Sequence, residues 1–202
     1  MPKIQAVFLD LGNVLAFHDD EVLCQRLSEY GGAPPEVIRE RLLALWGPFN
    51  RGTVAGDELR RAVCQAAGAT TVMDADSFCQ MWTCHFRVHH EVLPLVKALL
   101  ARVKVGLLSN TNEIHWRFVR PRIPVIEGFH DFILSYELGL AKPEPEIFRT
   151  AVRRMGSPAE ACAYFDDMPA FVEAACALGI KGQVFTTAAK FREQLAGLGL
   201  LL

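Results

Sequence analysis

Apolar residues follow two different rhythms along the chain, and these divide it into two kinds of segment. Between residues 17 and 87 they recur at helical spacing, interrupted by turn signals rich in glycine and proline. This pattern predicts about four helices in a bundle of roughly seventy residues. From residue 88 onward, helical segments alternate with short apolar runs. Such alternation predicts an α/β fold, with a doubly wound parallel sheet covered by helices.

The short apolar runs are the expected strands of this sheet. The first run precedes Asp10, and because Gly12 and Asn13 interrupt it, Asp10 falls at the carboxyl end of the strand. Further strands are expected at residues 103–108, 132–135, 161–165 and 184–185. The helical bundle is therefore an insert that follows the first strand. Residues 195–202, rich in leucine, are expected to pack in the core or to form a self-association surface.

Composition and charge exclude several classes of function. The chain has 202 residues, of which 51% are hydrophobic and 22% charged, as expected for a globular protein with a sizeable core. The net charge is −2 without a dense basic block, so we expect neither nucleic acid nor a membrane as partner. No apolar run approaches the ~18 residues that span a bilayer. The start of the chain lacks the pattern of a secretory signal, so we expect a cytoplasmic protein, either a monomer or a homodimer.

The cysteines do not form a recognisable framework. Six of them occur at irregular spacing, and we expect all six to be reduced thiols. A local group of cysteines and histidines matches no zinc-binding spacing, so no zinc is expected there; it comprises Cys79, Cys84, His85, His89 and His90.

Chemically useful side chains follow the predicted strands. Asp10, Ser109, Lys142 and the pair Asp166-Asp167 each come after a strand, so a parallel sheet would bring them to one edge. Each has an ordinary alternative: Ser109 and the acidic pair could cap helices, and Lys142 could be a surface lysine. Together, carboxylates, a hydroxyl and an ammonium group suit a phosphate ester with a hard divalent cation, Mg²⁺. In this hypothesis Asp10 attacks phosphorus and forms an aspartyl-phosphate.

Four segments resemble the motifs of the haloacid dehalogenase superfamily, and the resemblance extends over nearly the whole chain. The matching segments are residues 8–14 (FLDLGNV), 107–112 (LLSNTN), 138–148 (LGLAKPEPEIF) and 164–167 (YFDD). The helical insert resembles the small α-helical cap of this superfamily. The resemblance implies a Rossmann-like core at residues 1–16 and 88–202 and a cap at residues 17–87. The subgroup that the chain resembles most contains bacterial phosphatases acting on glucose 1-phosphate and similar small phosphoesters.

The resemblance also assigns roles to individual residues. It implies that Asp10 is both nucleophile and metal ligand, with the main-chain carbonyl of Gly12 as a second ligand. It favours Asp166 over Asp167 as the acidic ligand, and the sequence leaves open which of them binds the ion directly. Phosphate would be held by three residues, namely Ser109, Asn110 and Lys142. The implied function is a Mg²⁺-dependent phosphomonoester hydrolase acting on a small phosphorylated metabolite, such as a sugar phosphate.

Two positions depart from the pattern of the superfamily. Most of its phosphatases have a second aspartate where this chain has Gly12, and general acid–base assistance is typically worth ~10² to 10⁴ in rate. His18 could replace that acid, or it could be a hinge or surface residue. A sugar 1-phosphate needs a protonated leaving group less than an alkyl phosphate does, which favours glycosyl phosphates as substrates. Phe171 occupies a position that usually carries Asn or Asp, which predicts weaker Mg²⁺ binding.

Two alternative functions remain open at the level of sequence. A metal-independent 2-haloacid dehalogenase would also lack the second aspartate, but it would have no use for Asp166-Asp167. A non-catalytic phospho-ligand binder would be consistent with Gly12 and Phe171, but it would not need the complete set of catalytic side chains.

Overall fold

The centre of the fold is a five-stranded sheet in the order β5-β4-β1-β6-β7, in which every paired strand is parallel. We describe residues 3–201 in a computed structural model of the protein. The strands are β1 (Ala6–Leu9), β4 (Lys104–Ser109), β5 (Asp131–Leu134), β6 (Cys162–Asp166) and β7 (Lys181–Val184). The chain leaves central β1 toward one edge for β4 and β5, and then returns to the other edge for β6 and β7. This doubly wound order confirms the predicted α/β class.

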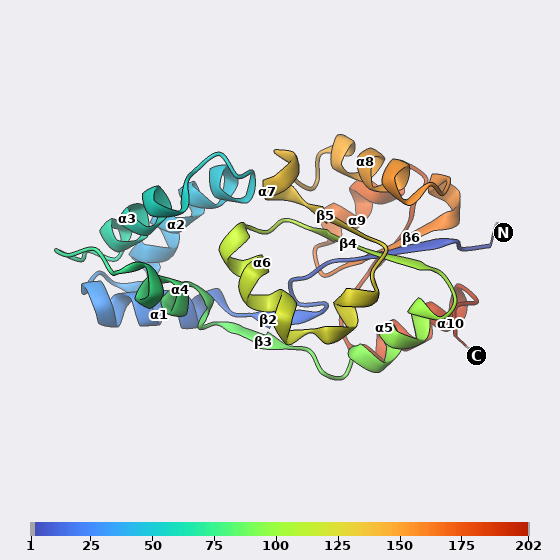
Figure 1. The fold of residues 1–202 in the computed structure, drawn as a ribbon, viewed down its shortest axis with the longest axis horizontal. Coiled ribbons are helices and arrows are strands. Elements are labelled where there is room, and N and C mark those ends of the chain that lie inside the picture. Colours follow the sequence, from blue (N-terminus) through green and yellow to red (C-terminus); the bar gives the residue numbers. More distant parts are fainter. Residues whose placement is uncertain (1–2, 202) are drawn as a thin grey trace.

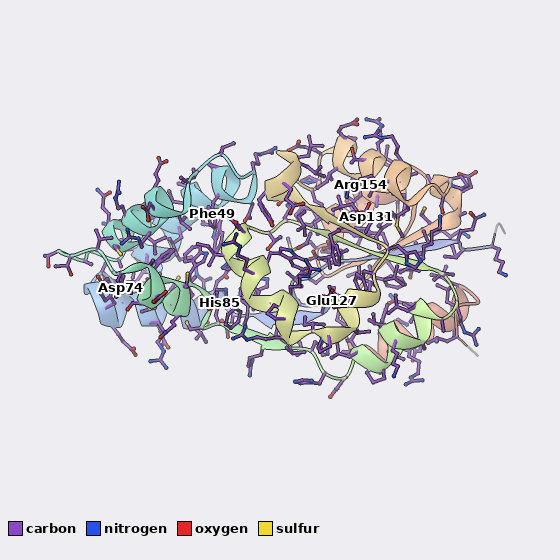
Figure 2. The ribbon with its side chains drawn as sticks, viewed as in Figure 1. Phe49, Asp74, His85, Glu127, Asp131 and Arg154 are labelled. Atoms are coloured by element: carbon purple, nitrogen blue, oxygen red, sulfur yellow. The ribbon has the colours of Figure 1, made fainter. Side chains whose placement is uncertain are left out.

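Helices cover both faces of this sheet. They are α5 (Leu93–Leu100), α6 (Glu113–Val119), α7 (Ser135–Leu138), α8 (Pro145–Met155), α9 (Pro169–Cys176) and α10 (Ala188–Gly197), with single 3₁₀ turns at Arg120–Arg122, Pro124–Gly128 and Ala159–Ala161. Figure 1 shows α8 and α9 on one side of the sheet and α5 and α10 on the other. Arg154 of α8 donates a hydrogen bond to Asp131 at the start of β5, from Nε to Oδ2 over 2.7 Å (Figure 2).

Burial on both faces explains the continuous apolar run of β1. Val7 and Leu9 belong to the apolar cluster beneath α5 and α10, whereas Ala6 and Phe8 belong to the cluster beneath α8 and α9. All four side chains are 0% exposed. A strand covered on both faces needs apolar residues at every position, so the sequence shows no alternation.

A helical unit made of α1 (Asp20–Gly31), α2 (Pro35–Asn50), α3 (Gly56–Ala66) and α4 (Ala75–Thr83) projects from one end of the sheet (Figure 1). These four helices follow the first strand, as predicted. They have a hydrophobic core of their own, in which Trp82 stacks on Phe78 at 5.7 Å between ring centroids and meets the edge of Phe49. Figure 2 labels Phe49 within this unit.

Two short strands, β2 (Ala16–His18) and β3 (Phe86–Val88), connect the helical unit to the sheet. They pair antiparallel, with Ala16 opposite Val88 and His18 opposite Phe86. These strands were not predicted from the sequence, because three residues are too few for an alternating pattern to be recognised. Both connections between the two parts of the molecule therefore run side by side.

The last strand differs from its prediction. It was expected at residues 184–185, but β7 spans Lys181–Val184, and its four residues are only half-buried. An edge strand has one neighbour and tolerates polar residues, so it lacks an apolar run that a sequence pattern could detect. In the leucine-rich end of the chain, Leu195 and Leu200 are buried in the apolar cluster on one face of the sheet. Of the two alternatives predicted for this segment, core packing is therefore favoured over a self-association surface.

The helical unit also contacts the core at a second place. Arg51, directly after α2, forms an ion pair with Glu144 and donates a 3.4 Å hydrogen bond to the carbonyl of Gly139. Gly52 lies so close to the carbonyl of Tyr136 that an added Cβ would be 2.3 Å from that oxygen. Among the helices of residues 3–201, none has the length and apolar character needed to cross a membrane.

Candidate active site

The carboxyl ends of three neighbouring strands bring the predicted residues together. Asp10 follows β1, Ser109 ends β4, and Asp166 ends β6, with Asp167 next to it. The main-chain N–H of Asp10 donates to the carbonyl of Phe165 over 3.0 Å, which continues the β1–β6 pairing by one residue. Lys142 reaches the same edge from the loop between α7 and α8.

Lys142 is the buried positive centre of this site. Its Nζ lies 2.9 Å from Oδ1 of Asp10 and 2.6 Å from Oδ2 of Asp166, and it donates a 3.2 Å hydrogen bond to the carbonyl of Leu108. The residue is only 3% exposed. Burial lowers the pKa of Lys142, but the two carboxylates outweigh that effect, and the pKa ends above its usual value. The side chain is therefore a fixed cation at neutral pH.

Asp10 is buried, and its two carboxylate oxygens have different neighbours. It is 7% exposed; its Oδ1 is paired with Lys142 Nζ at 2.9 Å, whereas its Oδ2 borders the open volume next to Gly12. Burial raises the pKa of Asp10 to about 6; the charge of Lys142 opposes this rise and that of Asp166 adds to it. A carboxylate in this state has an oxygen available for a reaction or for a cation.

The two neighbouring aspartates have different surroundings. Asp166 is fully buried: its Oδ2 accepts from Lys142 and from the hydroxyl of Tyr164, and its Oδ1 accepts from the main-chain N–H of Met168 over 2.8 Å. Asp167 is half-buried and lines the cavity described below, and its Oδ2 accepts from Asn13 Nδ2 over 2.8 Å. The carboxylate with free capacity toward the cavity is thus that of Asp167.

The segment after β4 holds Lys142 in position. Asn110 donates from Nδ2 to the main-chain carbonyl of Lys142 over 2.9 Å and accepts from the main-chain N–H of Lys142 over 2.8 Å. Its amide group is therefore engaged with the loop that carries the lysine. Ser109 is 2% exposed and lines the cavity together with Thr111, whose main-chain N–H donates to Ser135 Oγ.

The imidazole of His18 lies next to Gly12, the position at which most phosphatases of the superfamily have a second aspartate. A Cβ added to Gly12 would lie 3.1 Å from Nε2 of His18 and 3.8 Å from Oδ2 of Asp10, so both groups border the same small volume. Nδ1 of His18 lies 3.5 Å from Oδ1 of Asp20. The hydrogen bond to Asp20 raises the pKa of His18 above its usual value, although burial opposes the rise.

A cavity of about 370 Å³ joins the sheet edge to the helical unit. Trp46 and Asn50 of α2 line it from one side, and Asp10, Ser109, Lys142 and Asp167 line it from the other. Phe171, which stands where the superfamily usually has Asn or Asp, also lines the cavity. Its ring centroid lies 5.0 Å from Lys142 Nζ. An aromatic face near an ammonium group is a favourable contact but supplies no metal ligand.

Some cavity residues were not predicted from the sequence. They are Asp20, Leu43, Trp46, Asn50 and His85, all from the helical unit and its connections. Asp20 and His85 lie near the ends of the inserted segment, which was their only signal. Leu43, Trp46 and Asn50 lie in its middle and carried none, because which face of α2 meets the sheet depends on long-range packing.

Comparison with known proteins agrees with this description. Residues 4–179 match the haloacid dehalogenase-like hydrolase family, and the chain belongs to that family. It is therefore an enzyme of the hydrolase class. A D-ribitol-5-phosphate phosphatase of Bacteroides thetaiotaomicron is 27% identical over 154 residues, which are 72% of this chain and 74% of that protein.

Two solved structures of a haloacid dehalogenase family enzyme from Bacteroides thetaiotaomicron are also similar. The first is 26% identical, with a TM-score of 0.83 over 92% of this chain and 95% of that chain. The second, a complex with magnesium and inorganic phosphate, is 27% identical, with a TM-score of 0.80 over 91% of this chain and 94% of that chain.

Proposed function

We propose that this hydrolase is a Mg²⁺-dependent phosphomonoesterase acting on a small phosphorylated metabolite. One observation carries the proposal: buried Asp10 shares a cavity with the fixed cation Lys142, which lies 2.9 Å from its Oδ1, and with a second carboxylate, Asp167. The named activity of the ribitol-phosphate relative and the magnesium and phosphate bound by the similar structure support it.

The donor atoms fit a magnesium ion. Carboxylate oxygens of Asp10, Asp166 and Asp167 lie within 4.8 Å of one another, and an all-oxygen set is what Mg²⁺ prefers. Asp10, Asp167 and the main-chain carbonyl of Gly12 would hold the ion, whereas Asp166 is already occupied by its three hydrogen bonds. When bound, Mg²⁺ would neutralise negative charge on the phosphoryl oxygens. We thus favour Asp167 over Asp166 as the direct ligand.

Asp10 is the proposed nucleophile. One carboxylate oxygen forms a bond to phosphorus while the bond from phosphorus to the ester oxygen breaks, which leaves an aspartyl-phosphate and the alcohol. Water then attacks the acyl phosphate, releases inorganic phosphate and regenerates the carboxylate. Lys142 balances charge on the phosphoryl group, and Ser109 donates a hydrogen bond to it. Asn110 contributes by fixing the main chain of Lys142.

His18 is the proposed proton donor for the leaving group. Gly12 has no side chain for this task, and Nε2 of His18 borders the volume next to Asp10 that a side chain at position 12 would enter. Asp20 holds the opposite ring nitrogen, as an orienting carboxylate does for a catalytic histidine. Glycosyl phosphates, whose leaving groups need the least assistance, are the proposed preferred substrates, in keeping with the resemblance to glucose-1-phosphate phosphatases.

The helical unit is the proposed cap over this site. We assign residues 17–87 to the cap and residues 1–16 and 88–202 to the core. Trp46 and Asn50 of α2 then face the part of the substrate that lies beyond the phosphate. These side chains offer an aromatic surface and an amide, which suit a polyhydroxylated carbon chain.

Phosphate release from a panel of phosphomonoesters tests this function. We expect turnover with Mg²⁺, none with EDTA, and none for Asp10→Asn, while the exposed Asp76→Asn retains full activity as a matched control. Chloride or fluoride release from 2-haloacids that survives EDTA would instead indicate a dehalogenase. Mg²⁺ binding without turnover of any ester would indicate a non-catalytic binder.

A further inference from the structure

A second group of potential metal ligands lies at the junction between the helical unit and the core. His18 ends β2, Asp20 begins α1, and His85 immediately precedes β3. One ligand atom from each of these residues lies within 4.8 Å of the others. Figure 2 shows His85 between the helical unit and the sheet. The group shares no residue with the acidic cluster of Asp10, Asp166 and Asp167, although both groups contribute to the lining of the same cavity.

His85 is the member that an ordinary structural role does not explain. It is 4% exposed, yet its Nδ1 has no hydrogen-bond partner in the described part of the chain. Aromatic neighbours surround it, with Phe86 at 4.5 Å and His115 at 5.6 Å between ring centroids. A buried polar atom without a partner costs free energy, so it is rarely kept unless it has a use.

Burial also leaves His85 in the form that binds metals. It lowers the pKa of this imidazole to about 4, so the ring is neutral and carries a free lone pair at physiological pH. His18, the other histidine of the group, has its Nδ1 3.5 Å from Oδ1 of Asp20, so these two ligand atoms are already close together.

The donor set selects the kind of ion. Two imidazoles and one carboxylate suit Zn²⁺, whereas Mg²⁺ prefers oxygen ligands alone. Tetrahedral zinc with bonds of 2.0–2.1 Å places its ligand atoms about 3.3 Å apart. The 3.5 Å between Nδ1 of His18 and Oδ1 of Asp20 already approaches this separation. Because the ligand atoms of the group lie up to 4.8 Å apart, the side chains need to move by only about 1 Å to bind the ion. All three residues line the cavity, so the fourth position is open to it.

We propose that His18, Asp20 and His85 form a binding site for one Zn²⁺, distinct from the magnesium site. The bound ion joins both connections between the cap and the core, because its ligands come from the ends of β2 and α1 and from the residue before β3. It also takes the place of the proton shared by His18 and Asp20, so it competes with the proton transfer proposed above. That second consequence rests on the proposed function, whereas the binding itself does not.

Zinc binding can be measured directly. Metal-free full-length protein is titrated with Zn²⁺ in competition with a chromophoric indicator, with excess Mg²⁺ present to occupy the acidic cluster. We expect one equivalent of zinc, and the protein loaded with Co²⁺ should show the visible absorption of a tetrahedral site. His85→Gln and Asp20→Asn should each weaken binding at least about 100-fold. The exposed His90→Gln is the matched control and should bind like wild type.

One further variant makes the result decisive. Asp167→Asn should retain the zinc site, so a loss of zinc there but not in His85→Gln would place the ion in the acidic cluster and overturn the proposal. Absence of stoichiometric binding by wild type would also overturn it. The side chain of Asp20 is 45% exposed, so Asp20→Asn should leave the fold intact. This variant therefore tests the zinc site even if His85→Gln unfolds. Enzymatic turnover is not needed for any of these measurements, so their failure is distinguishable from failure of the proposed hydrolysis.

Discussion

Replacing Asp10, the proposed nucleophile, by asparagine should stabilise the metal-free protein while abolishing its activity. Burial raises the pKa of Asp10 from 3.8 to about 6, so the folded state holds a proton there more tightly than the unfolded state does. Between these two values the folded protein binds more protons, and stability therefore falls as pH rises. Above about pH 6 the penalty is complete, and two pKa units correspond to about 3 kcal/mol. The pKa of about 6 already includes the attraction of Lys142, so asparagine, which resembles the protonated side chain, avoids this penalty even though the pairing is lost.

The expected gain for Asp10→Asn depends on pH in a defined way. Without metal it should be about 3 kcal/mol in the free energy of unfolding near pH 7.5 and only about 1 kcal/mol near pH 4.5. Urea unfolding followed by circular dichroism measures both values, and Asp76→Asn, an exposed control, should stay within ~0.5 kcal/mol of wild type. Added Mg²⁺ should reduce the advantage of the variant, because wild type alone gains from binding. A variant that is less stable than wild type near pH 7.5, or a gain that does not change with pH, would refute the reasoning.

Four other substitutions test the site and the core. Asp166→Asn should destabilise the protein by about 3–5 kcal/mol in urea unfolding, since it replaces a fully buried carboxylate that accepts from Lys142, Tyr164 and the main chain of Met168; a loss below 1 kcal/mol would contradict the buried ion pair. Asp167→Asn should instead leave stability nearly unchanged and weaken Mg²⁺ at least about 100-fold in calorimetric titration. His18→Gln should slow hydrolysis of alkyl phosphates by about 10² to 10⁴ and of p-nitrophenyl phosphate much less, and equal losses would exclude a leaving-group role. Trp82→Ala, at a position 1% exposed, should cost about 3–5 kcal/mol, and retention of the wild-type midpoint would refute its role in the core of the helical unit.

The sequence predicted those parts of the structure that depend on local patterns. The continuous apolar runs of β1 and β6 identified strands buried on both faces, and the acidic residues at their ends were correctly expected to meet. The two linking strands were missed because three-residue strands carry no period, and β7 was misplaced because an edge strand can be polar.

The different surroundings of Asp166 and Asp167 could not be predicted. Adjacent residues at the end of a strand point in different directions, but which one meets Lys142 depends on a loop that starts more than twenty residues earlier. The position of His85 could not be predicted for the same reason, because its neighbours His18 on β2 and Asp20 on α1 are distant from it in sequence. Contacts of this kind arise from packing between elements and leave no pattern within either segment.

The antiparallel pairing of β2 with β3 has a mechanical consequence. Sliding one strand along the other would break the pairing of Ala16 with Val88 and of His18 with Phe86, so the register between the two connections is fixed. His18 belongs to the final pair of this ribbon, and its Nε2 borders the volume next to Asp10. In the proposed hydrolysis, the anchoring of the four helices and the placement of the proton donor therefore depend on the same three residue pairs.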